Sequence, residues 1–247
     1  PTTTIADMAL RSSPCSSKEM DLGCIQVART ACGDTVEARD KIHDRSCVAI
    51  EPKFFPMDFS KLVSHGASED LGMMVLAQQT MLDKFRSWCQ QVDVTYIFRV
   101  PSLSEFHDHR AVASSPRISL LTHYKTLLLI TVLKYQVFVN EWLTDIDVKS
   151  CDWALQVIDL STTPTLLVQI KQSFGILPKI QQGGLTLFNL LVDKLNAKTF
   201  ENTKLLQDYI TSFCLDRIPG ENVFMGSSCF KAAAKMLPSD DLPSDLL

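Results

Sequence analysis

Apolar residues recur at spacings of three and four along most of the chain from Ser68 onward, which is the pattern of amphipathic helices. The first run begins with a serine followed by two acidic residues, a typical helix start, and predicts a helix over about 68–92. A second run, over 127–143, is apolar on nearly every face and predicts a helix in the middle of a bundle. Strands and helices do not alternate along the chain. The pattern therefore predicts an all-α fold.

Further helices are expected after a break at 144–147, which offers a good helix cap. Thr163 followed by Pro164 marks the start of one of them, because proline is favoured at the first helical position. Gly175 and Pro178 are expected to end it. The expected helices span about 148–160, 163–174, 185–198, 202–214 and 221–237.

The region between the first two long helices is less regular. Residues 94–100 are β-branched and aromatic enough for a strand, but Pro101 closes the segment and we expect no partner strand nearby. Residues 101–116 predict a long polar loop with room for one helical turn. After Pro116, residues 118–124 are expected to continue as helix.

The first 62 residues have few periodic apolar positions and predict a largely flexible segment. The cluster Phe54, Phe55 and Phe59 is the exception, and we expect it to dock onto the folded part. We therefore divide the chain into a flexible segment 1–62, two small helical lobes 63–145 and 146–237, and an acidic tail 238–247.

The composition narrows the choice of partners. A formal net charge of −4 argues against nucleic-acid binding through a general basic surface. The longest apolar run is far shorter than the roughly 20 residues that cross a bilayer, so we expect no membrane partner. Eight cysteines occur without a C-x-x-C pair, and Cys89 and Cys214 lie in apolar helical patterns, which favours a reduced, cytoplasmic protein with inert thiols.

Two features invite a chemical interpretation, and each has a structural alternative. Gly183 and Gly184 precede a helix, but no strand comes before them and no Gly-Lys-Ser/Thr follows, so a sharp turn or close packing is favoured over phosphate binding. His107, Asp108 and His109 resemble a metal triad in composition, with a solvated loop as the favoured alternative. No catalytic motif is present. We expect no catalytic residue, no metal and no cofactor.

The segment after residue 177 carries a family resemblance. It contains Gln181-Gln182-Gly183-Gly184, a helix with Thr186, Phe188 and Asp193, and the stretch Ile-Pro-Gly-Glu-Asn-Val at 218–223. Together with the apolar stretch 118–140 and the tryptophan-bearing segment 152–156, these pieces resemble the capsid region of Gag-like polyproteins of copia-like LTR retrotransposons. The resemblance covers about 62–237.

This resemblance implies a retroviral-capsid-like bundle of two helical lobes whose copies assemble into virus-like particles in the cytoplasm. The chain itself is then the main partner. RNA is a weaker one, because the sequence lacks the zinc-knuckle segment that usually helps such proteins to bind it. The alternatives are a monomeric interaction module derived from such an element and, less favoured, a metal-dependent enzyme.

The expected self-association residues lie on the glycine turn, on the helix after it and on the last helix. Exposed apolar strips are expected on the two helices, although the same residues could instead fill the core of each lobe. A charge at Leu187 is therefore expected to alter assembly. The candidates are Gln181, Gln182, Gly183, Gly184, Leu187, Phe188, Leu191, Val223, Phe224 and Phe230, with Lys231 and Lys235 as residues that could face RNA.

Overall fold

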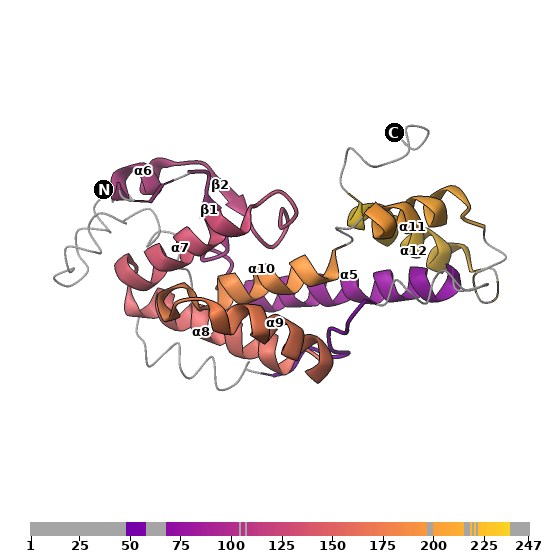
Figure 1. Ribbon diagram of the computed structural model, residues 1–247, viewed down its shortest axis with the longest axis horizontal. Coiled ribbons are helices and arrows are strands. Elements are labelled where there is room, and N and C mark those ends of the chain that lie inside the picture. Colours follow the sequence, from indigo (N-terminus) through magenta and orange to yellow (C-terminus); the bar gives the residue numbers. More distant parts are fainter. Residues whose placement is uncertain are drawn as a thin grey trace, which may run out of the picture.

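The computed structural model shows an assembly of helices around one long helix, α5 (Figure 1). It describes residues 48–57, 68–103, 105–106, 108–196, 200–214, 218, 220 and 222–237. The predicted all-α class is confirmed, since the only sheet in these residues has two three-residue strands. The elements are α5 (Ser68–Gln91), β1 (Arg99–Pro101), α6 (His109–Ser114), β2 (Arg117–Ser119), α7 (Leu129–Trp142), α8 (Asp145–Leu160), α9 (Pro164–Ile176), the 3₁₀ helix η2 (Lys179–Gln181), α10 (Gly184–Leu195), α11 (Phe200–Thr211) and α12 (Val223–Met236).

Local side-chain chemistry fixes several helix starts. At α8, the backbone N–H and the hydroxyl of Thr144 both donate to Asp147 Oδ2, at 3.1 and 2.7 Å. Tyr96 donates to the other oxygen of this buried carboxylate at 2.7 Å, so both oxygens accept hydrogen bonds. At α9, Pro164 occupies the first turn as predicted. At α12, Asn222 Oδ1 accepts from the backbone N–H of Met225 at 3.1 Å.

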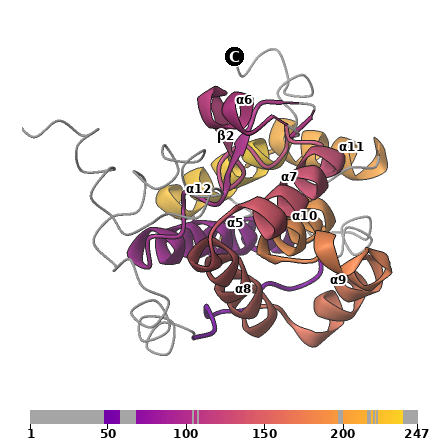
Figure 2. The same cartoon turned by 90° about the vertical axis from the view of Figure 1, so that its left-hand side faces the viewer.

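The larger of two hydrophobic clusters surrounds α10, which contacts α7, α8 and α9 and lies along α5 (Figure 1 and Figure 2). Its centre is aromatic. The Phe188 ring of α10 stacks on Phe85 of α5, with 5.2 Å between centroids, and meets Phe98 edge-on at 5.6 Å. These contacts hold the C-terminal half of α5 against the bundle. We call this packing unit the large cluster.

The second cluster lies at the other end of α5, where α11 and α12 pack (Figure 1). Its buried residues are Val75, Leu206, Tyr209, Ile210, Ala232, Ala233, Met236 and Leu237. We call it the small cluster. Gly72 allows the helices to approach closely here, because a Cβ at this position would lie 2.2 Å from the Tyr209 hydroxyl oxygen.

The two clusters do not follow the predicted lobes. The expected boundary between residues 145 and 146 falls just after the first residue of α8, which packs in the large cluster, and α5 contributes to both clusters. The division into lobes 63–145 and 146–237 stays a prediction. The flexibility expected for residues 1–62 concerns mainly residues outside the described part of the chain, as does the acidic tail 238–247.

Docking of the phenylalanine cluster is confirmed for Phe54. This side chain is fully buried in the large cluster. Its backbone N–H donates to the carbonyl of Ser161 and its carbonyl accepts from Thr163, both at 2.8 Å. Phe55 is half-buried, whereas Phe59 lies outside the described residues.

Two local predictions are wrong. Residues 99–101 do find a partner, since β1 pairs antiparallel with β2 at 117–119, and residues 118–124 consequently form a strand end and turns in place of a helix. The pairing is non-local and only three residues long, too short to show a period in the sequence. Gly175 does not end α9 either, because the helix continues to Ile176. The single helical turn expected in the loop before Pro116 is confirmed as α6.

Candidate functional site

The two glycines of the turn before α10 allow close packing of that helix against its neighbours. A Cβ at Gly184 would lie 2.4 Å from the backbone oxygen of Cys151 in α8, and one at Gly183 would lie within 2.5 Å of the Gln136 side chain in α7. Only glycine lets the start of α10 approach both neighbours this closely. Both glycines are buried, so neither reaches a partner directly.

The two glutamines before the glycines serve this same turn. The Gln182 carboxamide donates to the carbonyls of Leu177 at 2.8 Å and Phe174 at 3.3 Å, which satisfies acceptors at the end of α9. The Gln181 backbone carbonyl accepts from the Thr186 hydroxyl at 2.7 Å. Both glutamine side chains are half-buried. The Gln182 amide is therefore already engaged within the chain.

The prediction of an exposed apolar strip on α10 is wrong. Leu187, Phe188 and Leu191 are all buried in the large cluster, as is Leu185. α10 packs against α7, α8 and α9 together, which leaves these side chains no free side. They form part of the hydrophobic core. Because a buried charge is costly, a charge at Leu187 would disrupt folding before it could affect assembly.

The predicted candidates on α12 divide into exposed and packed residues. Val223 and Phe224 are exposed, and Phe224 keeps 88% of its surface accessible. Phe230 is half-buried, with its ring edge-on to Phe213 at 5.4 Å between centroids. We call Val223 and Phe224 the α12 surface. Their exposure is confirmed, and their role in self-association stays a prediction.

Lys231 and Lys235 are exposed on the same face of α12 as Phe224. Residues 224, 228, 231 and 235 follow the spacing of one helix face, while the opposite face carries the buried positions 229, 232, 233 and 236. This face is therefore apolar at its start and cationic at its end. Positive charge near a helix C-terminus also complements the helix dipole.

A second exposed apolar area lies at the end of α9, and the sequence analysis missed it. Ile176 is 85% exposed, and Ile180 of η2 is exposed four residues later. Asn140 of α7 donates to the Ile180 carbonyl at 2.7 Å, which fixes η2 against the bundle. We call Ile176 and Ile180 the α9–η2 surface. A signal existed, because Ile176 follows Gly175 and falls outside the apolar face of α9 formed by Leu166 and Ile170.

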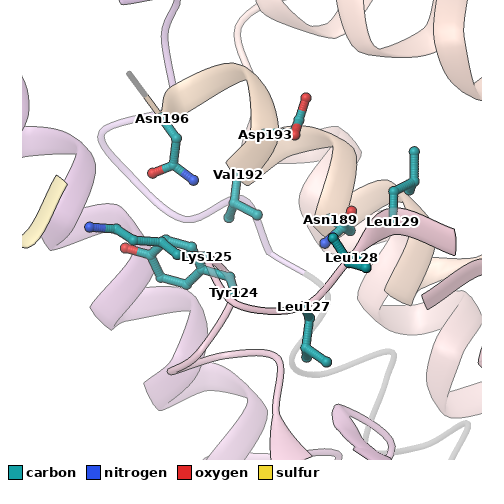
Figure 3. Close-up of a pocket in the computed structure, with 9 residues that line it drawn as sticks. All are labelled: Tyr124, Lys125, Leu127, Leu128, Leu129, Asn189, Val192, Asp193 and Asn196. Atoms are coloured by element: carbon teal, nitrogen blue, oxygen red, sulfur yellow. The ribbon is translucent and has the colours of Figure 1, made fainter. Parts of the chain in front are cut away.

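A pocket of about 140 Å³ opens between α10 and the chain leading into α7 (Figure 3). Asn189 and Val192 of α10 line it together with Asn196, which follows that helix, and Leu127 lies on the chain that leads into α7 (Figure 3). Its complete lining is Tyr124, Lys125, Leu127, Leu128, Leu129, Asn189, Val192, Asp193 and Asn196.

Lys125 connects this pocket to the small cluster. Its ammonium donates to the carbonyl of Leu237, just after α12, at 3.0 Å. Desolvation lowers the pKa of Lys125 from 10.5 to about 8, although part of the side chain reaches solvent. The lysine has no acidic partner in the part of the chain that the structure describes.

The cysteines in the part of the chain that the structure describes give no sign of a nucleophile. Burial raises the pKa of the Cys89 and Cys151 thiols, so both remain protonated near neutral pH. Cys214 lies beyond the end of α11 and is exposed, so its predicted place on an apolar helix face is wrong.

The histidine loop is only partly described. His107 lies outside the described residues, while Asp108 Oδ1 accepts from the backbone N–H of Ala111 at 3.4 Å at the start of α6. His109 is the first residue of that helix. Within the described residues no group of three or more His, Cys, Asp or Glu side chains could hold a metal ion.

Comparisons with protein-family models, with curated proteins and with solved structures found no match. Among the described residues, none of the helices has both the length and the apolar character needed to cross a membrane.

Proposed function

We propose that this chain is the capsid region of a Gag-like polyprotein of a copia-like LTR retrotransposon, and that it self-associates into larger assemblies. The observation that carries this proposal is the presence of two separate exposed apolar surfaces on one helical molecule. The α12 surface lies on a helix that packs in the small cluster, and the α9–η2 surface lies at the end of a helix that packs in the large one. The family resemblance of residues 62–237 supports the same function.

Two surfaces matter because a shell requires each copy to contact more than one neighbour. A molecule with one self-complementary patch stops at a dimer, whereas two patches on different elements allow assembly to continue. Figure 1 places α12 and α9 on different parts of the molecule. Large apolar side chains as exposed as Phe224 and Ile176 are typical of interaction sites when they cluster. Individually weak contacts then add up in the assembled state.

RNA is the weaker partner in this proposal. Lys231 and Lys235 continue the face of α12 that starts with Phe224, so assembly through Phe224 would gather lysines from several copies. The net charge of −4 limits the affinity of a single copy. We propose a cytoplasmic, non-enzymatic protein that encloses RNA only after assembly has concentrated these lysines.

The test compares three charge insertions at exposed apolar positions. Phe224→Asp and Ile176→Asp each remove one surface, while Leu160→Asp, on α8 and outside both surfaces, is the matched control. Sedimentation velocity should show assemblies larger than dimers for the natural chain and for Leu160→Asp. Each single surface variant should reach dimers at most. A natural chain that stays monomeric at high concentration would refute the proposal.

A monomeric interaction module is the second candidate, and the pocket beside α10 favours it. Asn189 lines that pocket, and its carboxamide makes no hydrogen bond within the described chain, so it is open to a ligand or to water. This reading predicts a monomer that binds one peptide. The same sedimentation experiment distinguishes it from the capsid proposal.

A further inference from the structure

Three consecutive large apolar side chains are exposed at the start of α7. Leu128, Leu129 and Ile130 keep 70%, 38% and 56% of their surfaces accessible. In the part of the chain that the structure describes, no other run of three large apolar residues is exposed in this way. An exposed apolar run of this length marks an interaction site. We call these three residues the α7 surface.

The chain that follows α12 begins close to the α7 surface. The ammonium of Lys125 donates to the carbonyl oxygen of Leu237 at 3.0 Å, and Leu237 is the last described residue. Lys125 precedes the α7 surface by three residues on the same segment of chain (Figure 3). Its Cα atom and that of Ile130 are five residues apart, so at most about 18 Å separates them. The segment after residue 237 therefore begins within a short distance of the exposed apolar side chains.

The following residues, 238–247, are long enough to reach this surface. A fully extended chain advances about 3.3 Å per residue, so this segment spans up to about 33 Å. Leu242, the first large apolar residue after Leu237, can by itself lie about 17 Å from the start of the segment. A segment that is tethered so close to its site needs little intrinsic affinity, because its effective concentration there is about millimolar.

The composition of residues 238–247 complements the surface and the lysine beside it. Their sequence holds three leucines, three aspartates and no basic residue, and reads Pro-Ser-Asp-Asp-Leu-Pro-Ser-Asp-Leu-Leu. Lys125 has no acidic partner within the described residues. Asp240 and Asp241 follow the carbonyl that Lys125 contacts by only three and four residues, so either carboxylate can reach the ammonium. An apolar residue comes directly after this acidic pair.

We propose that residues 238–247 bind the α7 surface of the same copy of the chain. One of the two neighbouring aspartates pairs with the Lys125 ammonium, and Leu242 covers Leu128 and Ile130. The hydrogen bond from Lys125 to the end of α12 fixes the point from which the segment starts. Because the contact is intramolecular, this inference holds whether or not the chain self-associates.

Photo-crosslinking in the full chain tests which segment covers the surface. Ile130→p-benzoylphenylalanine places a photoreactive apolar side chain in the α7 surface. Val168→p-benzoylphenylalanine is the matched control, since Val168 of α9 is 58% exposed and Ile130 is 56% exposed. Each variant is irradiated as an equal mixture of unlabelled and ¹⁵N-labelled chains, and mass spectrometry identifies the linked peptides. Position 130 should link to residues 238–247 of the same isotope, whereas position 168 should not link to them.

The isotope pattern also separates the other possible occupants of the surface. Links between unlabelled and labelled chains at position 130 would make a second copy the occupant and overturn the proposal. Links from position 130 to another segment of the same chain would overturn it too, as would the absence of any link to residues 238–247.

Variants of the segment then assign its contacts. Leu242→Asp should lower the yield of the link from position 130 about fivefold or more, because it removes the apolar side chain that covers the surface. Ser244→Asp adds the same charge without removing a leucine, so it is the control and should leave the yield within about twofold. Lys125→Gln should lower the yield about twofold, since an exposed ion pair contributes little. Equal yields for Leu242→Asp and Ser244→Asp would overturn the role of Leu242.

Discussion

The large and small clusters share helix α5 but are held together in different ways. The large cluster surrounds α10 on several sides and includes two stacked rings, one from α5 and one from α10, with the Phe98 ring edge-on to both. In the small cluster, α11 and α12 pack on the N-terminal half of α5, with small residues such as Ala232 and Ala233 in its core. Because buried apolar surface supplies most of the stability of a domain, the large cluster is expected to dominate folding.

The residues that stabilise the fold and those proposed for self-association also lie in different clusters. The apolar residues that the sequence suggested for assembly on α10 belong to the large cluster and hold it together, whereas Val223 and Phe224 lie on the outside of the small one. A small unit with few buried contacts opens more readily than the core on which it rests. The proposed α12 contact therefore lies on the less stable part of the molecule.

The largest effect is expected from Phe188→Ala, in the centre of the large cluster. Removing this ring leaves a cavity between Phe85 and Phe98 and should lower the free energy of unfolding by about 3–5 kcal/mol. Denaturant unfolding followed by far-ultraviolet circular dichroism measures the change. A loss below about 1 kcal/mol would mean that these rings are not packed as described.

Leu206→Ala should have a smaller and local effect in the small cluster. Deleting this fully buried side chain is expected to cost about 2–3 kcal/mol, the lower part of the range for such changes, because neighbouring small residues can close around the gap. Hydrogen exchange should show faster exchange in α11 and α12 while α8 and α10 keep their protection. Equal acceleration throughout the chain would show that the two clusters unfold as one unit.

Tyr96→Phe tests a polar contact inside the large cluster. The variant removes the hydroxyl that donates to the buried Asp147 carboxylate at 2.7 Å, which should cost about 1–2 kcal/mol. Tyr124→Phe is the control, because the Tyr124 hydroxyl has only a long 3.4 Å contact with Gln79. Thermal unfolding of both variants measures the difference. Equal losses would contradict the assigned role of the Tyr96 hydroxyl.

The smallest effect concerns the junction between the clusters, where Lys125 contacts Leu237. The folded state lowers the pKa of Lys125 to about 8, so between about pH 8 and its ordinary value of 10.5 the unfolded chain binds more protons. The stability of the natural chain should therefore rise with pH in this window relative to Lys125→Met. Denaturant unfolding at pH 7 and pH 9.5 measures the change. A difference that does not depend on pH would contradict the lowered pKa.

The sequence predicted the long helices because their apolar spacing is a local property. The expected helices over 68–92 and 127–143 correspond to α5 and α7 within two residues at each end. The pairing of β1 with β2 was missed because it joins segments 18 residues apart through three residue pairs. Short non-local pairings of this kind leave no period in the sequence.

The burial of the apolar residues of α10, which were expected to be exposed, has a physical reason that is visible in the sequence. Leu187, Phe188 and Leu191 lie in a helix whose apolar residues cover well over half of its circumference, more than the narrow stripe of a surface helix. The pocket could not be predicted, since Asn189 and Lys125 are brought together only by the packing of α10 against the chain before α7.

The most direct test of the account is the sedimentation velocity of the natural chain beside the double variant Phe224→Asp/Ile176→Asp. The account predicts assemblies larger than dimers for the natural chain and a folded monomer for the double variant, because the α12 surface and the α9–η2 surface then each carry a charge. A double variant that assembles as the natural chain does would contradict the central claim, as would a natural chain that remains monomeric.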